Sequence, residues 1–224
     1  MYLYLYKYNM SYSQWGEDIF LYDNYFSDVK NGTFVELGAL DGVLYSNTKF
    51  FEDTLNWSGI LIEPHPLKFV SLQHNRPRCM LFNNLVSCHS EELDFKYFVD
   101  GLAAVSGVEN TLSQHHFDTY YNRDIYSHIL QSNIRIKPKS LTDIITSTDI
   151  THINFLSLDV EGHEYEVLMS WDFSIPIDLI LIETLGVDPA RDELSRQILL
   201  RNGYVLDNIF SYNEIYILKN LRLY

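Results

Sequence analysis

The sequence is short of positive charge and of cysteine. Its 224 residues include 16 lysines and arginines against 30 aspartates and glutamates, which gives a net charge of −14. Because this excess of negative charge repels a phosphate backbone, we expect no nucleic-acid partner and a neutral or cationic ligand instead. The two cysteines, Cys79 and Cys88, show neither a disulfide framework nor the spacing of a zinc site. The simplest expectation is a reducing compartment, the cytoplasm.

Long apolar runs and a secretory leader are also missing. No stretch approaches the roughly 18 apolar residues that suggest a membrane-spanning helix, and residues 1–10 lack a basic start followed by an apolar segment. We therefore expect a soluble chain without a membrane span. The 46% of hydrophobic and 21% of charged residues are typical of a globular protein and argue against disorder or a coiled coil. This length predicts a single domain, 1–224.

The order of apolar segments predicts strands that alternate with helices. Runs typical of buried strands occur at 33–37, 60–62, 80–86, 153–158 and 177–182, and helical spacing occurs at 48–55, 66–76, 141–146, 164–169 and 192–200. Such alternation favours parallel strands joined by right-handed crossovers, so the predicted fold class is open α/β. We expect Gly59 to end the helix before the second strand. The pieces 204–206 and 215–218 are expected to pair as antiparallel strands.

Two segments fall outside this pattern. Residues 1–30 are predicted to form an N-terminal arm, in which tyrosines alternate with other residues, followed by a helix. Residues 102–132 are polar and aromatic, and we interpret them as an insertion or lid over the edge of the sheet. The neighbours His115 and His116 lie there. Because adjacent side chains diverge on a helix or strand, we interpret them as surface or core histidines rather than metal ligands.

The sharpest local signal is the glycine-bearing loop after the first strand. Gly38 allows the backbone to approach a ligand at the carboxyl end of that strand, where open α/β sheets bind their ligands. The pattern G-x-G-x-x-G is absent, and Glu36 and Asp41 bracket the loop, so a pyrophosphate is not expected. Two acids suit a ligand with an ammonium or a sulfonium, and S-adenosylmethionine has both and no phosphate. Glu63, which ends the second strand, is placed to accept both ribose hydroxyls. An ordinary surface turn is the alternative.

A second group of titratable residues follows the strand predicted at 153–158. Asp159 ends this strand, and Glu161 and His163 follow within one turn, facing the same crevice. A hydroxyl becomes a good nucleophile only when a positioned group removes its proton. We predict Asp159 as this catalytic base, with Glu161 and His163 as helpers. Alternatively, Asp159 and Glu183, which end successive strands, hold a magnesium or manganese ion that lowers the pKa of the hydroxyl. The structural alternatives are a helix-capping turn from Asp159 to Gly162 and a Glu183 that is simply a solvated strand end.

Seven short motifs occur in order along the chain. They are Ser13-Gln14-x-Gly16-Glu17-Asp18, Glu36-Leu37-Gly38-Ala39-x-Asp41-Gly42, Ser46-Asn47-Thr48, Trp57-x-Gly59, Ile62-Glu63-Pro64, Asn75-Arg76 and Asp159-Val160-Glu161-Gly162-x-Glu164. Together they resemble the FkbM family of S-adenosylmethionine-dependent methyltransferases, from about Ser13 to Lys219. The resemblance implies the Rossmann-like, seven-stranded sheet of class I methyltransferases, mostly parallel with an antiparallel C-terminal hairpin and with helices on both faces.

The resemblance also implies a reaction and a set of binding residues. Family members typically methylate hydroxyls, often of sugars, so the expected acceptor is a sugar or glycan and the expected cofactor is S-adenosylmethionine. The implied cofactor contacts are Glu36, Gly38 and Asp41 at the methionine end, Asn47 in the same wall, Glu63 at the ribose, Ser87 near the adenine, and Gln14 reaching across the methionine moiety. The stretch 102–132 matches no family motif, which leaves the acceptor open.

Two other classes of function compete with this interpretation. The run Tyr45-Ser-Asn-Thr-Lys49 has the Tyr-x-x-x-Lys spacing of short-chain NAD-dependent oxidoreductases and epimerases. In those enzymes the pair lies on a helix well beyond the nucleotide loop, whereas here it adjoins the first loop. A catalytically inactive scaffold that binds the cofactor is the second alternative, and the acids in both loops argue against it.

Overall fold

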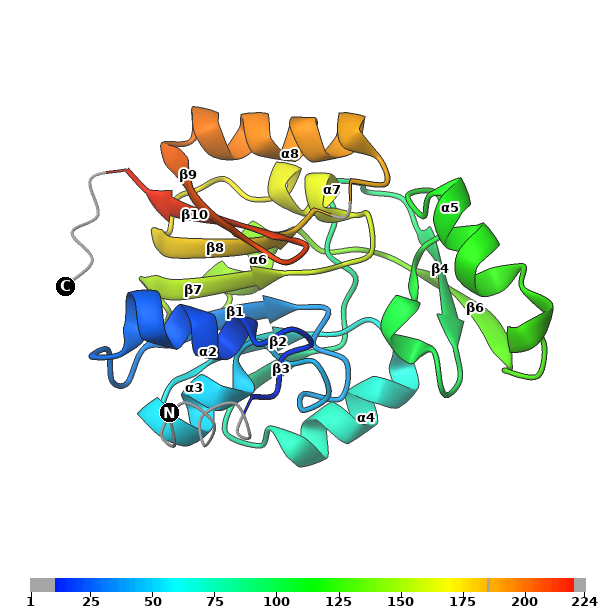
Figure 1. Cartoon of the computed structure of the whole chain (residues 1–224), viewed down its shortest axis with the longest axis horizontal. Helices are drawn as coiled ribbons and strands as arrows, with labels where there is room; N and C mark the ends of the chain where they lie inside the picture. Colours follow the sequence, from blue (N-terminus) through cyan, green and yellow to red (C-terminus); the bar gives the residue numbers. More distant parts are fainter. Residues whose placement is uncertain (1–10, 185, 220–224) are drawn as a thin grey trace.

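The computed structural model describes residues 11–184 and 186–219 and is built around one large sheet (Figure 1). Its strands are β1 (Thr33–Leu37), β2 (Ser58–Ile62), β3 (Met80–Phe82), β7 (Ile153–Leu158), β8 (Ile177–Glu183), β9 (Tyr204–Phe210) and β10 (Asn213–Leu218). They lie in the order β3-β2-β1-β7-β8-β10-β9, and β10 runs antiparallel to both of its neighbours. This seven-stranded sheet, parallel except at the C-terminal hairpin, confirms the predicted fold class. The predicted arm at 1–10 lies outside the described residues.

Helices cover both faces of the sheet, as predicted. One face carries α2 (Glu17–Leu21), its continuation as a π-helix η1 (Tyr22–Phe26), α3 (Lys49–Leu55) and α4 (Pro66–Asn75); the other carries α6 (Leu141–Thr146), α7 (Glu164–Met169) and α8 (Pro189–Arg201). Successive residues of a strand point to opposite faces. Thus Phe34 packs in the core on the side of α3, whereas Val35 and Leu37 pack on the side of α6 and α7. Within the described residues, no helix is long and apolar enough to span a membrane.

The end of α3 differs from the prediction. The helix ends at Leu55, and Asn56 takes the left-handed conformation that closes it, with φ of 56°. Asparagine tolerates this conformation better than most residues. Gly59 instead lies inside β2, where a Cβ atom would stand 1.9 Å from the carbonyl oxygen of Phe34. The glycine therefore serves the close packing of two strands, and its assignment as a helix end was wrong.

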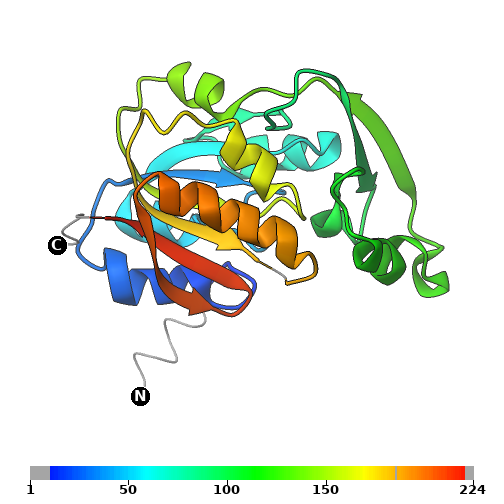
Figure 2. The same ribbon diagram turned by 90° about the horizontal axis from the view of Figure 1, so that it is seen from above.

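A second, smaller sheet is inserted between β3 and β7. It consists of β4 (Leu93–Phe98), β5 (Gly107–Val108) and β6 (Gln131–Ile136) in the antiparallel order β5-β4-β6. Four short helices accompany it: η2 (Ala103–Val105), α5 (Gln114–His116), η3 (Phe117–Tyr121) and η4 (Asp124–Tyr126). Figure 2 shows this unit, in green, beside the end of the large sheet toward which β1 and β8 point. The segment predicted as an insertion or lid, 102–132, lies within this unit.

Candidate functional site

A cavity lies at the carboxyl ends of β1, β2 and β7. It encloses about 890 Å³, part of which is open to solvent. The large sheet contributes Gly38, Glu63 and Asp159 to its wall, and the inserted unit contributes Ala104 and Ser106. Ligands of open α/β sheets bind at this end of the strands. The inserted unit therefore completes a cavity at the expected ligand-binding end of the sheet.

Gly38 makes the close approach between β1 and β7 possible. Its φ is +77°, a left-handed conformation, and a Cβ atom there would stand 1.9 Å from the carbonyl oxygen of Asp159. Its backbone N–H donates to the carbonyl of Ile62 at 3.2 Å. The loop after β1 is thus held against both neighbouring strands, and only glycine fits at this position.

Glu63 lies in the cavity wall at the end of β2. Its carboxylate accepts hydrogen bonds from the backbone N–H groups of Leu40 and His65, both at 2.7 Å. Burial raises the pKa of Glu63 to about 7. Each carboxylate oxygen has more than one lone pair, so the group retains acceptor capacity for a ligand hydroxyl. Gln14 also lines the cavity, although its side chain is exposed.

Glu36 is buried behind the cavity wall and is not among the described residues that line it. Leu37, the next residue of β1, packs on the face covered by α6 and α7. Glu36 therefore points to the opposite face, which α3 covers. Its carboxylate accepts from the backbone N–H of Asn47 at 2.7 Å and from the hydroxyls of Ser46 and Thr48. Burial raises the pKa of Glu36, while the nearby Arg76 guanidinium opposes this shift. Glu36 thus orders the turn that leads into α3, and its contact with a cofactor stays a prediction.

Three more of the predicted cofactor residues shape the loops beside the cavity. Asp41 accepts hydrogen bonds from the backbone N–H groups of the loop at positions 43 and 44. The amide of Asn47 donates to the hydroxyl of Ser157 at 3.0 Å, and the hydroxyl of Ser87 accepts from a backbone N–H at position 89. Neighbours of these residues, Leu44, Tyr45 and Val86, form part of the wall. The direct roles of Asp41, Asn47 and Ser87 in binding likewise stay predictions.

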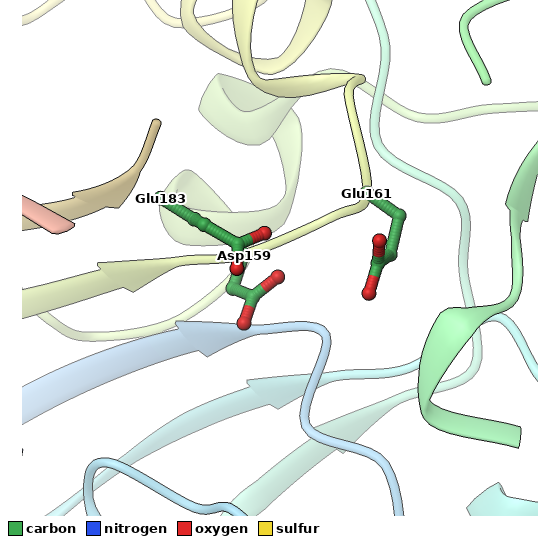
Figure 3. Close-up of side chains that lie close together, drawn as sticks. All are labelled: Asp159, Glu161 and Glu183. Carbon is green, nitrogen blue, oxygen red and sulfur yellow. The ribbon is translucent and has the colours of Figure 1, made fainter. Parts of the chain in front are cut away.

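Three carboxyl groups meet at the far end of the cavity (Figure 3). Leu158 of β7 pairs with Ile182 of β8, so the next residues along these parallel strands, Asp159 and Glu183, emerge side by side. Glu161 joins them from the loop after β7. One carboxylate oxygen of each residue lies within 4.8 Å of those of the other two. Asp159 and Glu183, predicted as alternative metal ligands, thus lie close together, and the catalytic or metal-binding roles of the three residues stay predictions.

The three carboxyl groups differ in how readily they lose a proton. Burial raises the pKa of Asp159, but a hydrogen bond with Glu183 opposes the shift. Burial and the negative charge of neighbouring carboxylates hold the pKa values of Glu161 and Glu183 well above their ordinary range. Three like charges at this distance cannot all be ionised without compensation. The cluster therefore retains a proton unless a cation compensates its charge.

Two histidines flank the carboxyl cluster. His163 lines the cavity; burial lowers its pKa to about 3, and its Nε2 is buried without a hydrogen-bond partner. Its Nδ1 lies 3.1 Å from the hydroxyl of Thr111. His116, from the inserted unit, places its Nδ1 3.5 Å from Glu161. The sequence interpretation treated His116 as a surface or core histidine; it is buried, but its place beside Glu161 depends on how the inserted unit packs against the loop after β7, which no local pattern reveals.

The sequence matches a known family model, and several solved structures have a similar fold. The family model described as "Methyltransferase FkbM domain" matches residues 36–206. No curated protein matches. Solved structures with a similar fold include a TehB-like SAM-dependent methyltransferase from Corynebacterium glutamicum (8% identity, TM-score 0.46, 92% of this chain and 88% of that chain). TrmK of M. capricolum in complex with S-adenosyl-homocysteine is another (10% identity, TM-score 0.44, 87% of this chain and 65% of that chain). A methyltransferase from Pyrococcus furiosus is a third (13% identity, TM-score 0.40, 90% of this chain and 80% of that chain).

Proposed function

The chain belongs to the FkbM family of methyltransferases, which use S-adenosylmethionine, and on this premise we propose that it methylates a hydroxyl group of a sugar or glycan. The single observation that carries the proposal is the cavity that joins a glycine loop, an acceptor carboxylate and a cluster of protonatable carboxyls. The first two suit the cofactor, and the third suits an acceptor that must lose a proton. Two unpaired thiols, Cys79 and Cys88, support a cytoplasmic location.

The residues in the wall fit S-adenosylmethionine. Gly38 and Gln14 both line the cavity, and the backbone of the Gly38 loop, packed against the end of β7, contacts the methionine moiety. Glu63 accepts hydrogen bonds from the ribose hydroxyls, which ionised carboxylates bind well. The unpartnered Nε2 of His163 offers a further hydrogen-bonding group at the wall. Glu36, Asp41, Asn47 and Ser87 support this site through the loops that they order.

The carboxyl cluster supplies the proton acceptor for the reaction. When bound, the cofactor supplies an electrophilic methyl group attached to sulfonium. Asp159 then accepts the proton of the acceptor hydroxyl, because it lies in the cavity wall at the carboxyl end of β7, opposite the close approach of Gly38. Glu183 donates a hydrogen bond that steadies Asp159, and Glu161 orients the hydroxyl. His163, whose pKa is about 3, is neutral and takes part as a hydrogen-bonding group rather than as a general base.

A divalent cation is the second candidate for this cluster. Magnesium or manganese prefers carboxylate oxygens, and Asp159 and Glu183, together with Glu161, offer three of them within 4.8 Å. A bound ion would compensate the negative charges and lower the pKa of the acceptor hydroxyl. Thermal unfolding with magnesium, manganese or EDTA distinguishes the two arrangements without an acceptor. A rise in the melting temperature with either ion, absent in the Glu183→Gln variant, supports the metal.

Titration calorimetry with S-adenosylhomocysteine tests the cofactor assignment. We expect micromolar binding, with or without EDTA if the cluster works by proton transfer. Asp159→Asn should keep this binding and lose turnover on sugar acceptors, whereas Asp149→Asn, an exposed aspartate, should change neither. No binding under any condition contradicts the proposed methyltransferase function, and full turnover by Asp159→Asn contradicts the role of Asp159.

A further inference from the structure

We propose that the methyl acceptor binds in a second cavity, on the other side of Glu161 and Glu183 from the cofactor, and that this cavity selects a neutral or amine-bearing polyol over an anionic one. The proposal rests on the methyltransferase function proposed above. It assigns a separate binding site to the acceptor and a charge class to the acceptor itself.

The second cavity touches the first one only at the carboxyl cluster. It encloses about 560 Å³, and among the described residues the two cavities share Glu161 and Glu183 and no other lining residue. Asp159, the proposed base, lines the first cavity and not the second, so the acceptor hydroxyl must reach past Glu161 and Glu183 to lie beside both Asp159 and the methyl group. The cluster is therefore the meeting point of two ligands rather than the bottom of one pocket.

The wall of the second cavity comes from three parts of the chain. The inserted unit contributes Thr111, Ser113 and His116, the loop after β7 contributes Gly162, and the segment that begins α8 contributes further polar residues. The inserted unit also roofs the cofactor cavity. It thus lines both sites, and residues that matched no family motif in the sequence help to form the proposed acceptor site.

The side chains that line the second cavity are suited to a neutral or cationic ligand. Five carboxyl groups line it, those of Glu161, Glu164, Glu183, Asp188 and Asp192. Among its described lining residues the one guanidinium is that of Arg191, which already binds the carboxylate of Glu166 and the carbonyl of Gly162. Burial lowers the pKa of His116, so its ring is neutral at pH 7. A carboxylate or phosphate on the acceptor would find no uncommitted positive charge, whereas hydroxyl and ammonium groups would find many acceptors.

His116 is oriented to accept a hydrogen bond in this cavity. Its Nε2 lies 2.9 Å from the carbonyl of Val105, and a carbonyl can only accept, so Nε2 carries the proton. In the neutral ring Nδ1 is then an acceptor, and it lies beside Glu161. A hydroxyl next to the one being methylated can donate to this nitrogen, which would fix the acceptor against the cluster.

Three methyl glycosides test the charge selection. With the protein saturated with S-adenosylhomocysteine, binding of methyl glucoside, methyl glucosaminide and methyl glucuronide is measured by saturation-transfer NMR and calorimetry. We expect the first two to bind and the glucuronide to bind about tenfold more weakly or worse. Tighter binding of the glucuronide, or no binding of any of the three, overturns the proposal.

Variants at Val187 test the location. Its side chain lines the second cavity and is partly exposed, so a larger residue can be placed there without burying it. Val187→Trp should weaken glycoside binding about tenfold and leave the affinity for S-adenosylhomocysteine within about twofold. Val187→Lys should improve binding of the glucuronide. Val70→Trp, on the exposed face of α4, is the matched control and should change neither ligand.

The two levels of the proposal fail in different ways. If S-adenosylhomocysteine does not bind, the methyltransferase function itself fails. If it binds normally but Val187→Trp leaves glycoside binding and turnover unchanged, the function stands and the second cavity is not the acceptor site.

Discussion

The substitution Gly38→Ala offers a quantitative test of the cofactor site. A methyl group at this position meets two separate obstacles. The first is the left-handed backbone, with φ of +77°, which costs a residue with a Cβ about 1 to 2 kcal/mol. The second is the carbonyl oxygen of Asp159, 1.9 Å from where the new Cβ would stand, whereas ordinary contact begins near 3.4 Å. The difference, 3.4 − 1.9 = 1.5 Å, is the distance by which the loop after β1 and the end of β7 must separate.

Gly186→Ala isolates the first obstacle. Gly186 also has a left-handed backbone, with φ of +67°, but a Cβ there has no heavy atom within 4 Å. We expect it to lower the free energy of unfolding by at most about 1 to 2 kcal/mol, or the melting temperature by about 2 to 8 °C. Binding of S-adenosylhomocysteine should not change. Gly38→Ala should lose more stability than this control and weaken that binding about tenfold or more, because a shift of about 1.5 Å breaks hydrogen bonds at the wall.

Thermal unfolding and titration calorimetry of Gly38→Ala and Gly186→Ala test whether the loop after β1 contacts the cofactor and whether its approach to Asp159 stabilises the fold. If Gly38→Ala binds S-adenosylhomocysteine as tightly as the unchanged protein, the loop does not contact the cofactor and the binding site must be assigned elsewhere. If the two variants are equally stable, the approach of the loop to Asp159 is not a constraint on the fold.

Three further predictions follow from buried charges. Arg76→Met leaves the buried carboxylate of Glu52 with only the half-exposed Arg78 and removes the cation beside Glu36. It should cost about 3 to 5 kcal/mol, about 10 °C in melting temperature; a fall below about 2 °C contradicts this. Glu63→Gln should weaken S-adenosylhomocysteine binding about tenfold, as calorimetry would show, whereas unchanged affinity would remove Glu63 from the ribose site. Burial raises the pKa of both Glu63 and Glu164 from 4.5 to about 7, so between these values the folded chain holds protons that the unfolded chain has released. The stability that these two protonated groups contribute is present below pH 4.5 and is lost as the pH rises through 7. The melting temperature should therefore fall less steeply between pH 5 and 8 in Glu164→Gln than in the unchanged protein. An equal slope in the two proteins argues against the raised pKa of Glu164.

The buried strands and their helices could be predicted from the sequence because burial restricts them to apolar residues in regular patterns. The predicted bounds of β1, α6, β7 and α7 coincide with those of the structure. Both faces of β1 and β7 are covered by helices, so these strands consist of continuous apolar runs that composition alone reveals. The small sheet was harder to predict, because β6 alternates exposed and half-buried residues and its first half, 131–133, is polar.

Some site residues could be placed from the local sequence, and others depend on contacts between distant parts of the chain. Asp159 and Glu183 were expected to lie together because parallel strands end at one edge of a sheet, which the chain order already implies. That Glu36 points away from the cavity follows from strand alternation and could have been inferred. The position of His116 could not, since it depends on contacts between the inserted unit and Glu161, which lies 45 residues further along the chain (161 − 116 = 45).

The position of β10 between β8 and β9 also bears on how the chain leaves the ribosome. β8 is complete at Glu183, but its open edge is paired only by β10, which begins at Asn213. Until that segment has been synthesised, the apolar run of β8 presents unpaired backbone groups, the kind of edge that recruits other chains. β10 pairs with β8 on one side and with β9 on the other, so β9 joins the sheet only through β10. Aggregation during synthesis should therefore depend on how quickly the last strand arrives.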